Sequence, residues 1–319
     1  MLDLFYTNEK NTLVKVEEDI LDRGSFDFNN FWINMINPTD REIEEIARLT
    51  NTPEDMIKAP LDEEERARIE KEGDSTLVLV DIPVLEEEEG YYSYSTLPMG
   101  IIHKGDYVIT VCLKETVILR DFERGRIKDF RTYKKTKFLL EILYNISTKF
   151  LAYLKQIDKA SARIQNELHK STRNKELIQM LDLENSLVYF STSLKANDMI
   201  INKLTRTNMV RKYEEDADLL EDVAVENQQA LEMCNIYRDI LSGTMDAYAS
   251  VISNNQNKVM KTLTVITMMI SIPSLIASVF GMNTGVPGQG SILAFWIVVA
   301  FSFVLSIIAG IILFKSNKF

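Results

Sequence analysis

The sequence predicts an α+β membrane protein, with an N-terminal cytoplasmic α/β domain, a long helical stalk and two C-terminal transmembrane helices. Three observations lead to this fold class. No Asp, Glu, Lys, Arg or His lies between Lys261 and Lys315. Neither glycine nor proline occurs from Arg126 to Ser242. The preceding residues alternate strand-like and helix-like patterns. We therefore expect three parts, at residues 1–125, 126–256 and 257–319.

Two uncharged segments, residues 263–280 and 292–314, are each long enough to cross most or all of a bilayer as a helix. The connection between them, residues 281–291, is rich in glycine and contains Pro287, so it cannot continue a helix. The two segments therefore predict a transmembrane hairpin with an outer loop. The alternative is a pair of buried core helices in a soluble protein, which two charge-free runs of this length disfavour.

Basic residues flank the hairpin on one side of the membrane only. Lys258 and Lys261 lie around the start of the first span, Lys315 and Lys318 follow the second, and the loop has no basic residue. By the positive-inside rule both ends face the cytoplasm. We expect a multi-pass protein of the cell (inner) membrane with both termini cytoplasmic.

Small and polar residues form a stripe on one face of the first span. They fill six of seven positions that recur at alternating steps of four and three, the exception being the first: Met260, Thr264, Thr267, Ser271, Ser274, Ser278 and Gly281. One interpretation is packing between membrane helices, which small residues and hydroxyls commonly mediate. The other is a pore lining, which requires a homo-oligomer because two helices cannot enclose a pore. The second span is almost entirely aliphatic and aromatic, which suits a lipid-facing ring.

The glycine- and proline-free region predicts three long helices with breaks near residues 170–174 and 208–214. The third is expected to run from about residue 215 into the first span, some 65 residues or roughly 100 Å. Upstream, strands are predicted at residues 31–36, 76–85, 95–103 and 107–113. Helices are predicted after Thr39, a favourable N-cap, and after Pro53.

Composition excludes several function classes. The net charge of −11 disfavours a nucleic-acid partner and favours cations. Cys112 and Cys234 form no CxxC pattern, and no signal peptide is evident at the N-terminus. The sequence contains no GxGxxG opening a helix, GxxxxGK[ST], HExxH or GxSxG motif, so we expect neither an enzyme nor a prosthetic group.

The tripeptide Gly281-Met282-Asn283 ends the first span, ahead of a second span and a lysine-bearing tail. In this position it resembles the CorA family of divalent-cation transport proteins. The stretch from Asp246 through Asn257 to Thr264 is similar to that family's passage from stalk to pore. The order of elements also fits over the whole chain, although the first 120 residues or so match only in outline.

The resemblance implies a CorA-like, funnel-shaped homopentamer in the lipid bilayer, with Gly281, Met282 and Asn283 as its selectivity filter. Mg²⁺ sheds its water reluctantly, so neutral oxygens of Asn283 and Gly281 suit the hydrated ion. The resemblance assigns four further positions to the pore, Asp246, Asn257, Met260 and Leu263. The stripe residues continue this lining toward the filter.

Mg²⁺ is the favoured cargo, and Zn²⁺, Co²⁺ and Ni²⁺ stay open as alternatives. The outer loop lacks the acidic residues that many members carry, and its Val-Pro-Gly is similar to a Zn²⁺-associated branch. A non-transporting, membrane-anchored scaffold or sensor is the alternative from a different function class.

The resemblance also implies a regulatory Mg²⁺ site at Asp222, 24 residues before Asp246 on the expected third helix. The family's partner aspartate corresponds roughly to residues 56–61, where this chain has Lys58 and Ala59. Asp62 or Glu63 is the substitute we expect. The simpler interpretation of Asp222 is a solvated surface acid.

Overall fold

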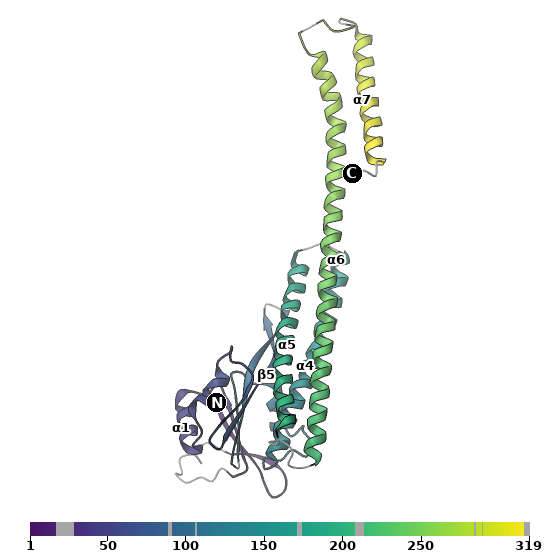
Figure 1. Ribbon diagram of the computed structural model, residues 1–319. Coiled ribbons are helices and arrows are strands. Elements are labelled where there is room, and N and C mark those ends of the chain that lie inside the picture. The colour runs from purple at the N-terminus through teal and green to yellow at the C-terminus, as the bar shows by residue number, and fades with distance from the viewer. Residues whose placement is uncertain are drawn as a thin grey trace. The chain divides into compact units, whose positions relative to one another are not determined.

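The computed structural model describes residues 1–16, 29–88, 91–105, 107–170, 174–207, 214–283, 285–288 and 290–315. The chain divides into two compact units, unit 1 (Met1–Gly243) and unit 2 (Thr244–Phe319) (Figure 1). Lys318 and Thr284 lie outside the described residues.

Unit 1 is built on a seven-stranded sheet in the order β2-β1-β3-β7-β6-β5-β4. Every neighbouring pair is antiparallel except β3 and β7, which are parallel. The strands are β1 (Leu2–Thr7), β2 (Leu13–Val16), β3 (Phe31–Ile36), β4 (Arg68–Glu72), β5 (Ser75–Glu88), β6 (Tyr91–Lys104) and β7 (Tyr107–Cys112).

Side chains alternate between the two faces of this sheet, and both faces are buried. On one face, Leu4, Ile33 and Met35 pack with residues of α1 (Asp40–Thr50), α2 (Glu54–Lys58) and η2 (Ala59–Leu61). Thr39 caps α1 as predicted, because its hydroxyl accepts from the Glu42 N–H and the Glu42 carboxylate accepts from the Thr39 N–H.

The other face carries an aromatic cluster beneath α3 (Val117–Glu123) and α4 (Lys135–Lys170). The ring of Trp32 lies edge-on to Phe138, with 5.2 Å between centroids, and its Nε1 donates to Thr110 Oγ1 at 2.8 Å. Helix α5 (Asn174–Arg206) covers β5 and β6 on this face (Figure 1). The sheet is therefore the middle layer of three.

The three long helices occur where predicted. α4 ends at Lys170, α5 spans Asn174–Arg206, and α6 (Glu214–Phe280) runs without interruption into the first apolar segment. Within unit 1, α5 and α6 are joined by buried polar contacts: Asn227 Nδ2 donates to the Leu194 carbonyl, and Cys234 Sγ to the Leu187 carbonyl.

The four predicted strands are confirmed, and β5 and β6 are longer than expected. β1, β2, β4 and α3 were not predicted. β4, with the sequence Arg-Ile-Glu-Lys-Glu, lies at the edge of the sheet and is mostly polar, so its composition carries no strand signal. β1 lies in the interior of the sheet, and its position depends on partners distant in sequence.

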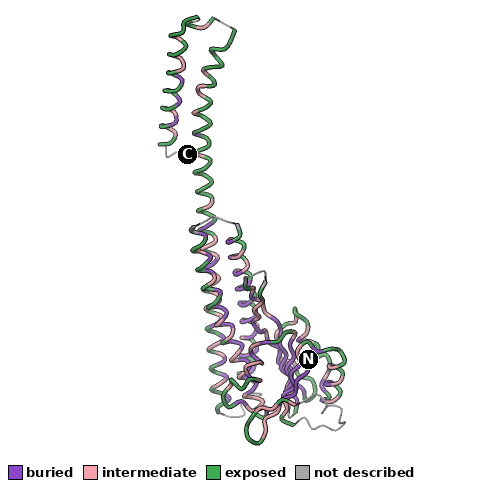
Figure 2. Tube along the Cα trace, turned by 180° about the vertical axis from the view of Figure 1, so that it is seen from behind, coloured by how far each residue is buried: buried purple, intermediate pink, exposed green. Residues whose placement is uncertain are grey.

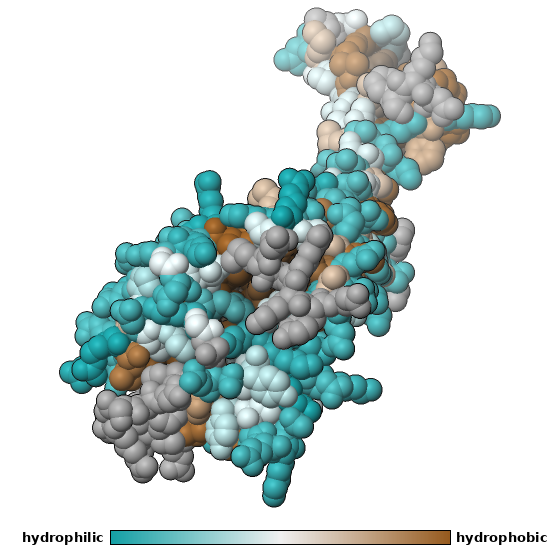
Figure 3. Space-filling model, turned by 60° about the horizontal axis from the view of Figure 1, so that its bottom comes forward, coloured by the Kyte–Doolittle hydropathy of each residue, from teal (hydrophilic) through white to brown (hydrophobic). Residues whose placement is uncertain are grey.

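Unit 2 contains the C-terminal part of α6 and α7 (Ile292–Lys315), joined by the glycine-rich loop. Both helices are long and apolar enough to cross a membrane, and only 6% and 17% of their most apolar windows are buried within the chain. Core helices of a soluble protein would be mostly buried. Figure 2 shows this exposure along both helices, whereas the face of unit 1 in Figure 3 is predominantly hydrophilic. The two predicted apolar helices and the loop between them are confirmed, and their exposure favours a membrane location.

Candidate functional site

The polar stripe of α6 faces away from α7. The α6 residues that line cavities shared with α7 include Val265, Met269, Pro273 and Ile276, and Gly281, after the end of the helix, also borders one of them. With 3.6 residues per turn, the stripe lies on the opposite side of the helix. All of its members are exposed in the single chain: Met260, Thr264, Thr267, Ser271, Ser274, Ser278 and Gly281. The stripe is therefore not the surface that joins the two spans of one chain.

The same face continues toward the start of unit 2. Asp246 and Asn257 are eleven residues apart, close to three full turns, and both are exposed. Leu263 is also exposed, at 56%. One helix face thus carries a carboxylate, an amide, two apolar residues and then a series of hydroxyls, ending at Gly281.

The contact between the spans is made by small residues of α7. Ser302, Ser306 and Gly310 are buried at intervals of four residues, and the Ser306 hydroxyl donates to the Met269 carbonyl. Small residues at this spacing allow membrane helices to approach closely. The composition of the second span suits a lipid-facing ring, and the buried stripe that packs on α6 was not predicted. The Ser-x₃-Ser-x₃-Gly spacing is the signal that would have found it.

The hydroxyls of the α6 stripe donate to their own helix. Thr264, Thr267 and Ser271 each donate to the carbonyl four residues earlier, in every case at 2.8 Å. A hydroxyl whose proton is used in this way presents oxygen lone pairs to its surroundings. The exposed face is thus lined with acceptors, which match the O–H groups of a hydrated cation.

Gly281, Met282 and Asn283 follow the last turn of α6 and are exposed. The Gly281 N–H closes that turn on the Ala277 carbonyl at 2.9 Å, and a Cβ at Gly281 would lie 3.3 Å from the same oxygen. The C-terminus of a helix carries partial negative charge, which attracts cations. The three residues therefore lie where neutral dipoles favour a positive ion.

The outer loop packs back onto α7. Gly288 has a φ of +84°, and a Cβ there would lie 2.7 Å from the Ala294 Cβ. Ser291 begins α7 by accepting from the Ala294 N–H, and its own N–H donates to the Gly288 carbonyl. A cavity of about 420 Å³ lies between this loop and the outer ends of both helices, beside Gly281 and Pro287. The loop thus fixes the chain on one side of the predicted filter.

The predicted regulatory residues are all exposed: Asp222 on α6, and Asp62 and Glu63 after η2. Asp62 accepts a hydrogen bond from the Glu64 N–H at 3.0 Å. Among the described residues of one chain, no three His, Cys, Asp or Glu side chains gather as metal ligands.

The sequence matches the family described as CorA-like Mg2+ transporter protein over residues 29–315. The chain belongs to this family. CorA proteins are membrane transporters of divalent cations rather than enzymes, which assigns the chain to that class.

Individual CorA relatives cover nearly the whole chain. The cobalt/magnesium transport protein CorA of Methanocaldococcus jannaschii is 26% identical over 92% of this chain and 93% of its own. The magnesium transport protein CorA of Helicobacter pylori is 21% identical over 86% and 88%. The complete structure of the CorA magnesium transporter from M. jannaschii matches with a TM-score of 0.83 at 23% identity, covering 100% and 99% of the two chains. This match confirms the fold predicted from the sequence.

Proposed function

We propose that the chain forms a homopentameric pore that admits Mg²⁺ across the cell (inner) membrane, with both termini in the cytoplasm. The observation that carries the proposal is the exposed polar face of α6, opposite the face that packs on α7. Hydroxyls and an amide on a spanning helix are unfavourable against lipid. Several copies with this face inward would surround a polar path, while α7 lies outside. The number five comes from the family resemblance.

The ion follows Asp246 and Asn257, passes Met260 and Leu263, and continues along the hydroxyls to the filter at Gly281, Met282 and Asn283. Apolar constrictions at Met260 and Leu263 gate by dewetting. The path offers neutral oxygens above Asp246, which suits an ion that keeps its water. The names of the relatives above, which transport magnesium or cobalt and magnesium, support this cargo.

The regulatory part of the proposal is a second Mg²⁺ site. Asp222 of one subunit and Asp62 or Glu63 of the next would bind cytosolic Mg²⁺ and hold the pore closed when that ion is abundant. The high exposure of all three side chains supports their availability to a neighbouring subunit.

Ion flux into liposomes that hold the purified full-length protein tests the function. Mg²⁺, Zn²⁺, Co²⁺ and Ni²⁺ are compared side by side at equal concentration gradients, with protein-free liposomes as the control. We expect Mg²⁺ flux well above the control. Flux of Zn²⁺ without Mg²⁺ would reassign the cargo. Absence of flux for all four ions would favour a membrane-anchored scaffold or sensor.

A further inference from the structure

Pro273 interrupts the hydrogen bonding of α6 inside the first span. In an α-helix the carbonyl of residue 269 accepts from the N–H of residue 273, and proline has no N–H. Nevertheless α6 remains helical through this point. The Met269 carbonyl therefore lacks its regular partner in a region without water, where an unpaired backbone group is unfavourable.

The Ser306 hydroxyl of α7 donates to this same Met269 carbonyl. Ser306 is 3% exposed, so its hydroxyl is enclosed between the two helices. A serine on a neighbouring helix thus replaces the donor that Pro273 removes. This contact links α7 to one defined position on the pore-lining helix.

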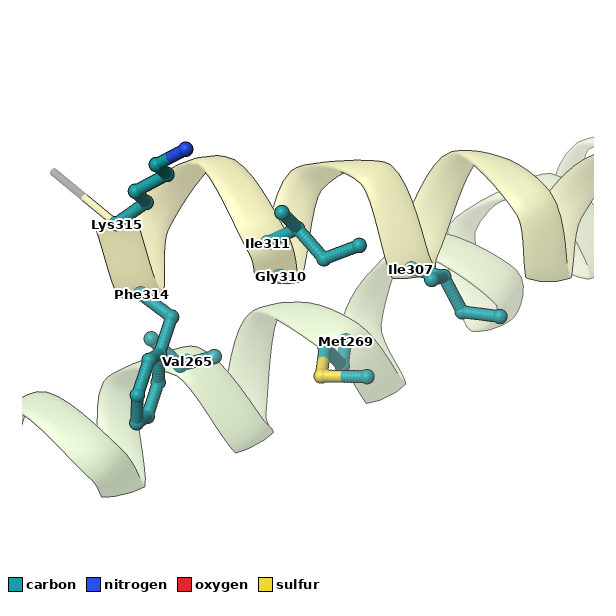
Figure 4. Close-up of a pocket in the computed structure, with 7 residues that line it drawn as sticks. All are labelled: Val265, Met269, Ile307, Gly310, Ile311, Phe314 and Lys315. Atoms are coloured by element: carbon teal, nitrogen blue, oxygen red, sulfur yellow. The ribbon is translucent and has the colours of Figure 1, made fainter.

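Gly310, one turn further along α7, makes the close approach possible. A Cβ at Gly310 would lie 2.9 Å from Met269 Sδ and 3.1 Å from its Cγ. Figure 4 shows the Met269 side chain between the helices beside Gly310. Met269 is therefore held twice, through its carbonyl by Ser306 and through its side chain against Gly310.

We propose that Ser306 is a positioning residue of the pore, which fixes α6 at its proline and thereby orients the segment that ends at the filter. Seven residues separate Pro273 from Gly281, and they include Ser274 and Ser278 of the stripe. A rotation of α6 at Pro273 would turn these groups relative to the pore axis. This inference rests on the proposed pore.

Ser302 provides a matched control. It is buried on the same face of α7 one turn earlier, at 5% exposure, but its hydroxyl donates to Val299 of its own helix at 2.8 Å. Ser302→Ala therefore removes a buried hydroxyl of the same size without removing a bond between helices.

A double-mutant cycle tests the proposal. Full-length wild type, Ser306→Ala, Pro273→Ala, the double variant and Ser302→Ala are placed in liposomes, and the ratio of Mg²⁺ to Co²⁺ flux is measured. This ratio does not depend on how many pores are intact, so loss of folded protein alone does not change it. The unfolding temperature of each protein in detergent is measured in parallel.

We expect Ser306→Ala to lower the unfolding temperature and to change the flux ratio. The expected change is about threefold, which is the factor that corresponds to the free energy of an average hydrogen bond between membrane helices. The Pro273→Ala variant regains a backbone N–H at this position, which restores the partner of the Met269 carbonyl. In that background Ser306→Ala should therefore change both quantities less than in the wild type, because the carbonyl keeps one donor. Ser302→Ala should match the wild type.

Equal effects of Ser306→Ala in the wild-type and Pro273→Ala backgrounds, or equal flux ratios for Ser306→Ala and Ser302→Ala, would overturn the proposal. If Pro273→Ala does not fold, Ser306→Thr decides, because it keeps the hydroxyl, with Ser302→Thr as control for the added methyl. A Mg²⁺ to Co²⁺ flux ratio that changes in Ser306→Thr but not in Ser302→Thr would then contradict the positioning role of the Ser306 hydroxyl. If wild type carries no divalent cation, the proposed function fails, whereas the thermal cycle still tests the coupling of Ser306 to Pro273.

Discussion

Asn197 on α5 bonds both backbone polar groups of Asp81 on β5. Its Oδ1 accepts from the Asp81 N–H at 2.9 Å, and its Nδ2 donates to the Asp81 carbonyl at 2.8 Å. β4 pairs with β5 only as far as Leu79, so one side chain takes the place of the missing strand beyond it. Asn197 is 2% exposed, which makes this a buried attachment of helix to sheet.

Asn197→Ala should lower the unfolding free energy of unit 1 by about 2–4 kcal/mol, because it leaves a buried N–H and carbonyl without partners. Urea unfolding of the full-length protein in detergent, followed by Trp32 fluorescence in a Trp296→Phe background, measures this. Asn202→Ala is the control, because Asn202 is exposed and, among the described residues, its side chain bonds Asp198 on its own helix. Equal losses in both variants would contradict the assigned role.

His103 should make unit 1 less stable as the pH falls from about 6.5 to about 4. Burial lowers the pKa of His103 to about 4, and its buried Nε2 has no hydrogen-bond partner among the described residues. The unfolded chain binds a proton near pH 6.5, whereas the native one does not until about pH 4, so acid favours unfolding across this interval.

The measurement is the difference between wild type and His103→Gln, because half-buried acids such as Glu123, whose pKa is raised by burial, also contribute to the pH profile. In His103→Gln the unfolding free energy should fall less steeply as the pH is lowered from about 6.5 to about 4. Parallel profiles for both proteins would show that His103 does not contribute.

Much of the fold follows from the sequence, because its signals are local. The absence of glycine and proline from residues 126–242 predicts α4, α5 and most of the cytoplasmic part of α6, and uncharged length predicts the hairpin. β1 and β4 were missed because their identity as strands depends on partners distant in sequence. The polar stripe of α6 was predicted because hydroxyls among apolar residues mark it. The hydrogen bond from Ser306 to the Met269 carbonyl was not predicted, because it depends on the register between two helices.

Thr267→Val should reduce Mg²⁺ flux by about tenfold, because it removes an acceptor from the proposed path. Thr262→Val is the matched control. Thr262 also donates to the carbonyl four residues earlier, at 2.9 Å, but it lies on the side of α6 away from the stripe. The two variants are compared by measuring Mg²⁺ flux into liposomes at equal protein content. A similar loss in both would argue that helix stability, rather than the pore face, explains the result.

Asn283→Ala should abolish most Mg²⁺ flux while the oligomer stays intact, since an exposed amide at the end of α6 has no structural contact to lose among the described residues. Flux and mass by light scattering are measured on the same preparation. Asn255→Ala, an exposed position on α6 away from the stripe, controls for the substitution itself. Unchanged flux in Asn283→Ala would remove it from the filter.

Asp222→Ala should leave a pore that still opens when cytosolic Mg²⁺ is high, because the regulatory site would lose a carboxylate. Currents are recorded while internal Mg²⁺ is varied. Glu221→Ala, the exposed neighbour, should keep the wild-type dependence. If Asp222→Ala and wild type respond identically, Asp222 is only a surface acid.

The parallel pairing of β3 with β7 has a consequence for synthesis on the ribosome. Ile33 pairs with Ile109, so the inner edge of β3 has no partner until more than seventy further residues have emerged. Until then the nascent chain displays an open strand edge lined with Trp32, Ile33 and Met35, which is the kind of surface that recruits other chains. Translation that stalls before Tyr107 should therefore yield aggregating fragments, and a chaperone that covers this edge would act before the membrane hairpin has been made.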